Sequence, residues 1–104
     1  MAIERLTLLT GDGDAGFVWA ACGWSAAREH RLAFTAFTIG DHGSVPDSAV
    51  PWHQACEVGP DGAVLVRPDG LIAWRATTLP DNPLAAISGA MDKILGTSSF
   101  KAAS

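Results

Sequence analysis

The chain has 104 residues, enough for one domain, and 48% hydrophobic with 17% charged residues is the composition of a globular protein. A net charge of −4 without a basic run argues against nucleic-acid binding, which needs clustered Lys and Arg. No apolar run approaches the ~20 residues of a membrane span and no signal-peptide pattern is present, so we expect no membrane partner and a cytoplasmic location.

The first elements are a strand and a helix separated by a glycine-rich break. Residues 5–10 are mostly apolar and predict a strand, which Gly11-Asp12-Gly13-Asp14 interrupts. Asp14 is a candidate N-cap for a helix over residues 15–30. Five residues at spacings of three and four predict the core-facing side of this helix: Phe17, Ala20, Ala21, Trp24 and Ala27. Trp19 falls off that side and is a candidate contact for a partner.

Residues 32–39 predict a second strand. A strand, a helix and a strand within about 35 residues indicate a right-handed parallel unit. A loop rich in Gly, Pro, Asp and Ser follows over residues 40–51, and residues 52–57 predict a short helical turn.

A hairpin occupies residues 59–75. Residues 59–62 predict a turn, and the mostly β-branched residues 63–67 predict a strand. Residues 63–66 of this strand are apolar in succession and should be buried on both faces. Pro68-Asp69-Gly70 then reverses the chain, because Pro presets one dihedral angle and Gly accepts a positive one. Residues 71–75 return as the next strand.

The last element is a helix. Asn82 is its candidate cap, and Pro83 suits the first helical position. One apolar stripe predicts its core-facing side: Leu84, Ile87, Met91, Ile94 and Leu95. Gly96 is expected to end it. We therefore expect a single domain over residues 1–96 and a flexible tail over residues 97–104.

The hairpin sequence resembles the C-terminal domain of the FAD-dependent aromatic hydroxylases, the flavin monooxygenases of phenol and aromatic-polyketide metabolism. The residues that carry the resemblance are Gly62, Ala63, Val64, Leu65, Val66, Arg67, Pro68, Asp69, Gly70, Trp74 and Arg75. It extends more loosely over residues 6–11 and the final helix. The resemblance implies a structural role for these residues and a thioredoxin-like fold without thioredoxin chemistry.

The expected architecture is thus α/β, in the order β-α-β-(α)-β-β-α, with a mixed four-stranded sheet and helices on both faces. We call this fold thioredoxin-like because of the element order and the resemblance together. In the family, FAD and the aromatic substrate belong to preceding domains. We therefore expect no cofactor on this chain, with FAD implied only for the parent enzymes.

Thiol–disulfide chemistry needs an activated thiolate and a resolving thiol, usually as Cys-x-x-Cys at the first helix's N-terminus. That position holds Gly11-Asp12-Gly13-Asp14, whose carboxylates would raise the pKa of a nearby thiol. Cys22 and Cys56 are predicted to be free buried thiols.

Other patterns in the sequence do not fit the binding or catalytic site that they suggest. Gly11-x-Gly13-x-x-Gly16 matches the dinucleotide fingerprint, but two acids stand where a pyrophosphate would sit. The same acids lack the distal Glu of a calcium loop. His42, His53 and Cys56 fit no zinc spacing, and Cys56 with His53 lacks a third group to orient a nucleophile. We expect no catalytic, cofactor-binding or metal-binding residue.

Two functions follow. The first is a non-catalytic module that packs against a flavin-binding hydroxylase domain or against itself as a homodimer, without activity alone. The alternative is a free-standing small-molecule-binding or redox protein that re-uses the fold, with residues 11–14 and 40–51 lining its site.

Overall fold

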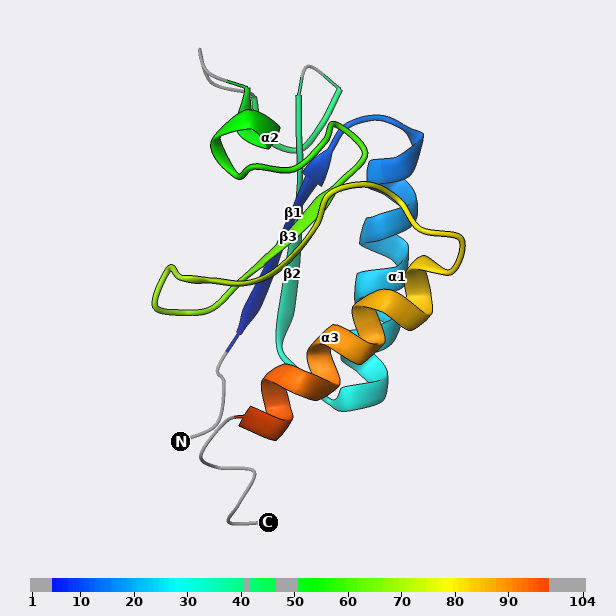
Figure 1. The fold of residues 1–104 in the computed structure, drawn as a ribbon, viewed down its shortest axis with the longest axis vertical. Coiled ribbons are helices and arrows are strands. Elements are labelled where there is room, and N and C mark those ends of the chain that lie inside the picture. Colours follow the sequence, from blue (N-terminus) through cyan, green and yellow to red (C-terminus); the bar gives the residue numbers. More distant parts are fainter. Residues whose placement is uncertain (1–4, 41, 47–50, 98–104) are drawn as a thin grey trace.

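The computed structural model describes residues 5–40, 42–46 and 51–97, with side chains described as far as Ile94. The chain forms four strands and three helices in the expected order (Figure 1). Their bounds are β1 (Leu6–Gly11), α1 (Asp14–His30), β2 (Phe34–Ile39), α2 (Trp52–Ala55), β3 (Ala63–Val66), β4 (Ile72–Ala76) and α3 (Pro83–Thr97).

The four strands form one mixed sheet in the order β2-β1-β3-β4. β1 pairs in parallel with β2, starting from Leu6 opposite Phe34. It pairs in antiparallel fashion with β3, where Leu8 lies opposite Leu65. β3 and β4 form the antiparallel hairpin, which has a bulge between Leu65 and Val66. The expected mixed four-stranded sheet is confirmed, and β1 is one of its two central strands.

Helices cover both faces of the sheet. α1 and α3 lie side by side on one face, whereas the short α2 lies on the opposite face, at the end toward which β1 points (Figure 1). Alternation along each strand divides the side chains between these faces. Leu8 and Leu65 face α1 and α3, whereas Leu9 and Val64 face α2.

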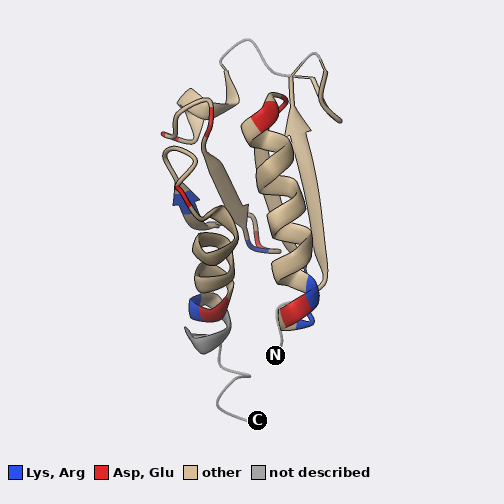
Figure 2. Ribbon diagram, turned by 90° about the vertical axis from the view of Figure 1, so that its right-hand side faces the viewer, with Lys and Arg blue, Asp and Glu red and all other residues tan. Residues whose placement is uncertain are grey.

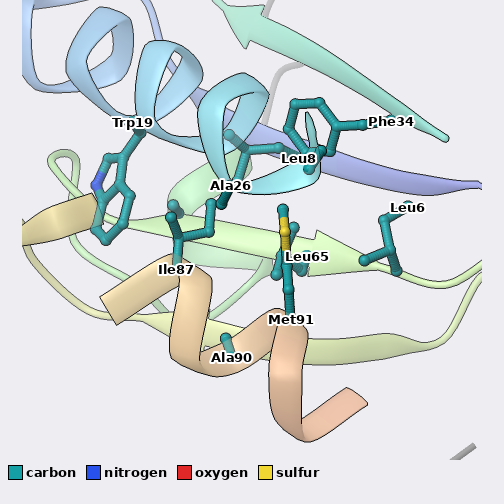
Figure 3. Packing of buried hydrophobic residues seen from close by; sticks show 11 residues of the cluster. Leu6, Leu8, Trp19, Ala26, Phe34, Leu65, Ile87, Ala90 and Met91 are labelled. Atoms are coloured by element: carbon teal, nitrogen blue, oxygen red, sulfur yellow. The ribbon is translucent and has the colours of Figure 1, made fainter. Parts of the chain in front are cut away.

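The main core lies between the sheet and the two long helices. Figure 3 shows Ile87 and Met91 of α3 and Trp19 and Ala26 of α1 directed toward the strand residues. The buried members are Leu6, Leu8, Trp19, Ala26, Ala27, Phe34, Ala63, Leu65, Ile87, Ala90 and Met91. A second, smaller cluster of Trp52, Val58 and Val64 lies under α2. As predicted, Ala63, Val64 and Leu65 are buried, with both faces of β3 covered.

α1 packs on the sheet through small residues. A Cβ atom at Gly16 would lie 1.7 Å from the carbonyl oxygen of Gly11, and one at Gly23 would lie 2.6 Å from the ring of Phe34. These glycines therefore allow the helix to approach the strands more closely than any side chain would permit.

The predicted core-facing side of α1 is wrong except at Ala27, which is buried. Phe17 and Trp24 are half exposed, whereas Trp19, placed outside the core, is completely buried. The buried side consists of Gly16, Trp19, Gly23, Ala26 and Ala27. The helix is rotated because its close contact with the sheet accepts small residues and one tryptophan at its margin, and excludes a stripe of large rings.

Two predictions at helix ends need correction. Gly13, with extended backbone, precedes α1 as its N-cap, so Asp14 is the first helical residue. α3 continues one residue past Gly96, to Thr97, and residues 98–104 lie outside the described part of the chain. The proposed tail stays a prediction. Asn82 caps α3 as expected, because its Oδ1 accepts a hydrogen bond from the Ala85 N–H at 3.1 Å.

Leu84 is the exception in the predicted stripe of α3. Ile87 and Met91 are fully buried and Ile94 is partly buried, but Leu84 is exposed in the first turn. The side chain of Leu95 lies outside the described part.

Candidate functional site

An open depression of about 440 Å³ lies where the parallel strands β1 and β2 end. Ligands of open α/β sheets commonly bind outside the carboxyl ends of strands, so this is the first place to look for a site. Its lining comes from the loops after both strands, from α2 and from the turn before β3. The lining residues are Gly11, Asp12, Gly13, Ile39, Gly40, Trp52, His53, Pro60 and Asp61.

Asp12, which follows β1, accepts a hydrogen bond from the loop after β2. Its Oδ2 accepts a hydrogen bond from the backbone N–H of His42 at 2.9 Å. Gly40 has a φ of +145°, and a Cβ atom there would lie 2.4 Å from the Asp12 carboxylate. The acid that stands where a redox protein would carry a cysteine is therefore bound to the backbone of the neighbouring loop.

The fingerprint Gly11-x-Gly13-x-x-Gly16 has a structural explanation at its third glycine. Gly16 lies against the carbonyl of Gly11 and allows the first turn of α1 to pack on β1. The described residues that line the depression include Asp12 and Asp61 and neither Lys nor Arg. Negative charge beside the helix start disfavours a pyrophosphate, so the depression does not fit a dinucleotide-binding site.

The histidines and cysteines do not assemble into a metal site. Within residues 5–40, 42–46 and 51–97, no three His, Cys, Asp or Glu residues lie close enough to hold a metal ion. His53 lines the depression next to the Trp52 ring, at a centroid distance of 6.2 Å. His42 is exposed on the loop after β2.

Both cysteines are free, as predicted, but they are only partly buried, and they lie on opposite faces of the sheet. Cys22 packs against the main core on the side of α1 and α3, whereas Cys56 packs against the cluster under α2. Burial raises the pKa of the Cys22 thiol above its ordinary value of 9.0, because the thiolate loses hydration. A raised pKa disfavours the nucleophilic form.

The hairpin residues that carry the family resemblance hold the β3–β4 turn together. The Arg67 Nη2 atom lies 2.7 Å from Asp69 Oδ2, and Asp69 Oδ1 accepts a hydrogen bond from the Leu71 N–H at 3.1 Å. Gly70 takes the positive φ that the turn requires, at +90°. The Arg67–Asp69 ion pair therefore belongs to the turn itself. The Nη1 atom of Arg75 lies 3.9 Å from Oε1 of Glu57.

One buried aromatic side chain, Trp19, connects the site to the core. Trp19 donates its Nε1–H to the carbonyl oxygen of Asp61 at 2.9 Å, and its ring meets Trp74 edge-on at 5.8 Å. Trp24 meets Phe34 edge-on at 4.9 Å. The prediction that Trp19 contacts a partner is wrong, because its side chain is inside the domain. The neutral composition of the middle of α1 was the available signal that either side of this helix could be buried.

Comparisons with known proteins agree with the hairpin resemblance. The family described as "Aromatic-ring hydroxylase, C-terminal" matches residues 1–98. The 4-methyl-5-nitrocatechol 5-monooxygenase of a Burkholderia species is 37% identical over 83 residues, which are 80% of this chain and 15% of that enzyme. The 2,4-dichlorophenol 6-monooxygenase of Cupriavidus pinatubonensis is 35% identical over 95 residues, which are 91% of this chain and 16% of that enzyme.

A solved structure gives the same result. The crystal structure of a ternary complex of aklavinone-11 hydroxylase with FAD and aklavinone aligns with a TM-score of 0.72 and 30% identity, over 88% of this chain and 16% of that one. The chain belongs to the aromatic-ring hydroxylase C-terminal domain family. It spans about one-sixth of the length of the relatives it matches, so FAD belongs to the parent hydroxylases of which it resembles the C-terminal domain.

No described helix has the length and apolar character needed to cross a membrane.

Proposed function

We propose that this chain is a non-catalytic module that packs against the flavin-binding part of an aromatic-ring hydroxylase. The observation that carries the proposal is the extent of the family match. Residues 1–98 match a C-terminal domain, whereas the same chain aligns with only 16% of a hydroxylase that holds FAD and aklavinone. The chemistry of such an enzyme belongs to the remaining length.

The local geometry supports a structural role. The Asp12 carboxylate accepts a hydrogen bond from the neighbouring loop, and the Arg67–Asp69 pair is part of a turn. The thiol of Cys22 has a raised pKa and packs against the core. Each of these groups has a partner or an environment that explains it without a substrate. We expect no hydroxylation by this chain alone.

Light scattering tests the proposal. The chain is measured alone and mixed with the FAD-containing part of the Cupriavidus 2,4-dichlorophenol 6-monooxygenase that precedes the matched segment. Because the two parts are not joined by the chain in this mixture, we expect a weak complex that forms only at high protein concentration. A homodimer that excludes the flavin part would favour self-association, and a monomer that ignores it would count against packing.

The depression at the ends of β1 and β2 favours a second candidate, a small-molecule-binding protein. It joins the loop at residues 11–14 to the start of the loop after β2 and has an indole wall from Trp52. Titration with 2,4-dichlorophenol, followed by the backbone amide signals of Gly11, Gly13 and Gly40, tests it. Saturable shifts confined to these glycines would support binding, and unchanged signals would remove this candidate.

A further inference from the structure

The outward side of α1 is apolar along most of its length. Phe17 is 53% exposed, Trp24 50% and Val18 40%, and Ala21 lies exposed between them. Phe17, Ala21 and Trp24 follow at spacings of four and three, which puts them in one stripe on the helix surface. We call Phe17, Val18, Ala21 and Trp24 the α1 stripe.

The charges on α1 stand only at its ends. Figure 2 shows acidic colour at the start of the helix and charged residues in its last turn, with neutral residues between. Asp14 and Arg28 bound this neutral interval. A helix at a protein surface normally carries polar side chains opposite its buried side, and one that is apolar all round is covered on both sides. The surface of α3 is ordinary by comparison, with exposed Asp92 and Lys93.

The size of the stripe helps to identify what covers it. Two half-exposed aromatic rings with a valine and an alanine offer roughly 300 Å² of apolar surface, since each aromatic side chain buries about 150–250 Å² at most. A stable complex between separate proteins buries about 800 Å² on each partner. The stripe alone is therefore too small to hold two free copies of this chain together.

A domain that is covalently joined to its partner needs a smaller buried interface to stay docked. Covalent linkage raises the effective concentration of the partner to the millimolar range, so a modest apolar centre suffices for docking. The relatives in which this domain is about one-sixth of the enzyme provide such a partner within the same polypeptide. We infer that the α1 stripe is the surface by which this domain docks on the flavin-binding part of an aromatic-ring hydroxylase, an inference that rests on the proposed function.

Footprinting of a chimera tests the inference. This chain replaces the matched C-terminal segment of the Cupriavidus 2,4-dichlorophenol 6-monooxygenase, and the FAD-containing chimera is purified. Hydroxyl-radical oxidation of each side chain is compared between the chimera and the isolated chain by mass spectrometry. Phe17 and Trp24 should be oxidised severalfold more slowly in the chimera. Leu71 and Leu84, exposed on other elements, should be oxidised at the same rate in both proteins.

The outcomes separate the two proposals. Protection of Leu71, Ile72 or Leu84 without protection of the stripe would overturn the α1 assignment and leave the packing role standing. Equal oxidation of every side chain in the two proteins would overturn both.

A matched pair of substitutions provides a second readout. Ala21→Glu places a charge in the middle of the stripe, and Ala85→Glu places the same charge on the exposed surface of α3. Both alanines are exposed helical positions, so the isolated chain should tolerate either change. In the chimera, Ala21→Glu should abolish the protection of Phe17 and Trp24, because docking would bury an unpaired carboxylate. Ala85→Glu should preserve it, and equal effects of the two variants would contradict the inference.

Discussion

The indole Nε1–H of Trp19 donates a hydrogen bond of 2.9 Å to the carbonyl oxygen of Asp61. This bond joins the first helix to the turn that starts β3, across 42 positions of sequence. The ring is completely buried and meets Trp74 edge-on, so one side chain connects α1, the turn and β4.

Replacing Trp19 should therefore weaken the domain more than replacing Trp24. Trp19→Phe removes the hydrogen bond and leaves a cavity, which together should lower the free energy of unfolding by about 1–3 kcal/mol. Trp24→Phe keeps a ring beside Phe34 at a half-exposed position, so it should change the free energy of unfolding by less than about 0.5 kcal/mol. Urea unfolding of both variants provides the measurement, and equal losses would contradict the assignment of Trp19 to the core.

Two of the helical glycines, Gly16 and Gly89, should respond in opposite directions to replacement by alanine. A Cβ atom at Gly16 would overlap the Gly11 carbonyl, so Gly16→Ala should destabilise the domain by about 1–3 kcal/mol or more. A Cβ atom at Gly89 meets nothing within 4 Å, so Gly89→Ala should stabilise α3 by roughly 0.5–1 kcal/mol. Thermal unfolding midpoints test this, and a stabilising Gly16→Ala would show that α1 lies farther from β1 than the structure places it.

Gly70 isolates the energetic effect of backbone conformation. Its φ is +90°, and a Cβ atom there would meet nothing within 4 Å. Gly70→Ala should lower the free energy of unfolding by about 1–2 kcal/mol through backbone strain alone. Gly70→Asn should cost less, because Asn tolerates positive φ better than Ala. If urea unfolding showed no loss for Gly70→Ala, the turn would have to adopt another conformation.

The partly buried thiol of Cys22 should make the stability of the domain depend on alkaline pH. Its pKa in the folded chain is raised above 9.0 by burial, so the folded state holds this proton more tightly than the unfolded state. The resulting stabilisation is complete below pH 9.0 and is lost as the pH rises through the folded pKa. Unfolding free energies of the native chain should therefore fall above pH 9.0 more than those of Cys22→Ala.

Other groups that titrate near this pH interfere little with the comparison. The chain contains no tyrosine, and Cys56 is present in both proteins, so its titration cancels in the comparison. Iodoacetamide should also alkylate Cys22 more slowly in the native chain than in urea, with the site identified by mass spectrometry. Parallel pH curves for the two proteins would mean that the thiol is hydrated in the folded state.

Local sequence signals predicted the hairpin and the start of α3 well. Gly70 at a positive φ and Asn82 at a helix start are choices that backbone conformation and unsatisfied N–H groups impose, so each can be recognised from a few neighbouring residues. The order of strands and helices followed from the same signals, together with the preference for right-handed parallel units.

The orientation of α1 could not be obtained in this way. Phe17 and Trp24 have the size and spacing of core residues, and no charge between Asp14 and Arg28 marks a solvent side. What decides the orientation is the short distance between helix and sheet, which requires Gly16 and Gly23 at the contact. That distance is a property of the assembled fold.

The hydrogen bond between Asp12 and the loop after β2 could not be predicted from the sequence either. Asp12 appeared as one of two acids in a glycine-rich break, and its bond to the backbone of His42 crosses 30 positions of sequence. Periodicity and turn propensity are local quantities, so they do not indicate which distant N–H group a carboxylate will find.

The central position of β1 has a consequence for the synthesis of this domain. Thr7 pairs with Val66, so the first strand has no partner on that side until most of the domain has been translated. Until β3 leaves the ribosome, Leu9 and its neighbours present an open strand edge and an uncovered apolar face, the features that holdase chaperones bind. Within a longer enzyme, this domain would therefore need protection for most of its own translation, because α3, which covers the main core, is translated last of its elements.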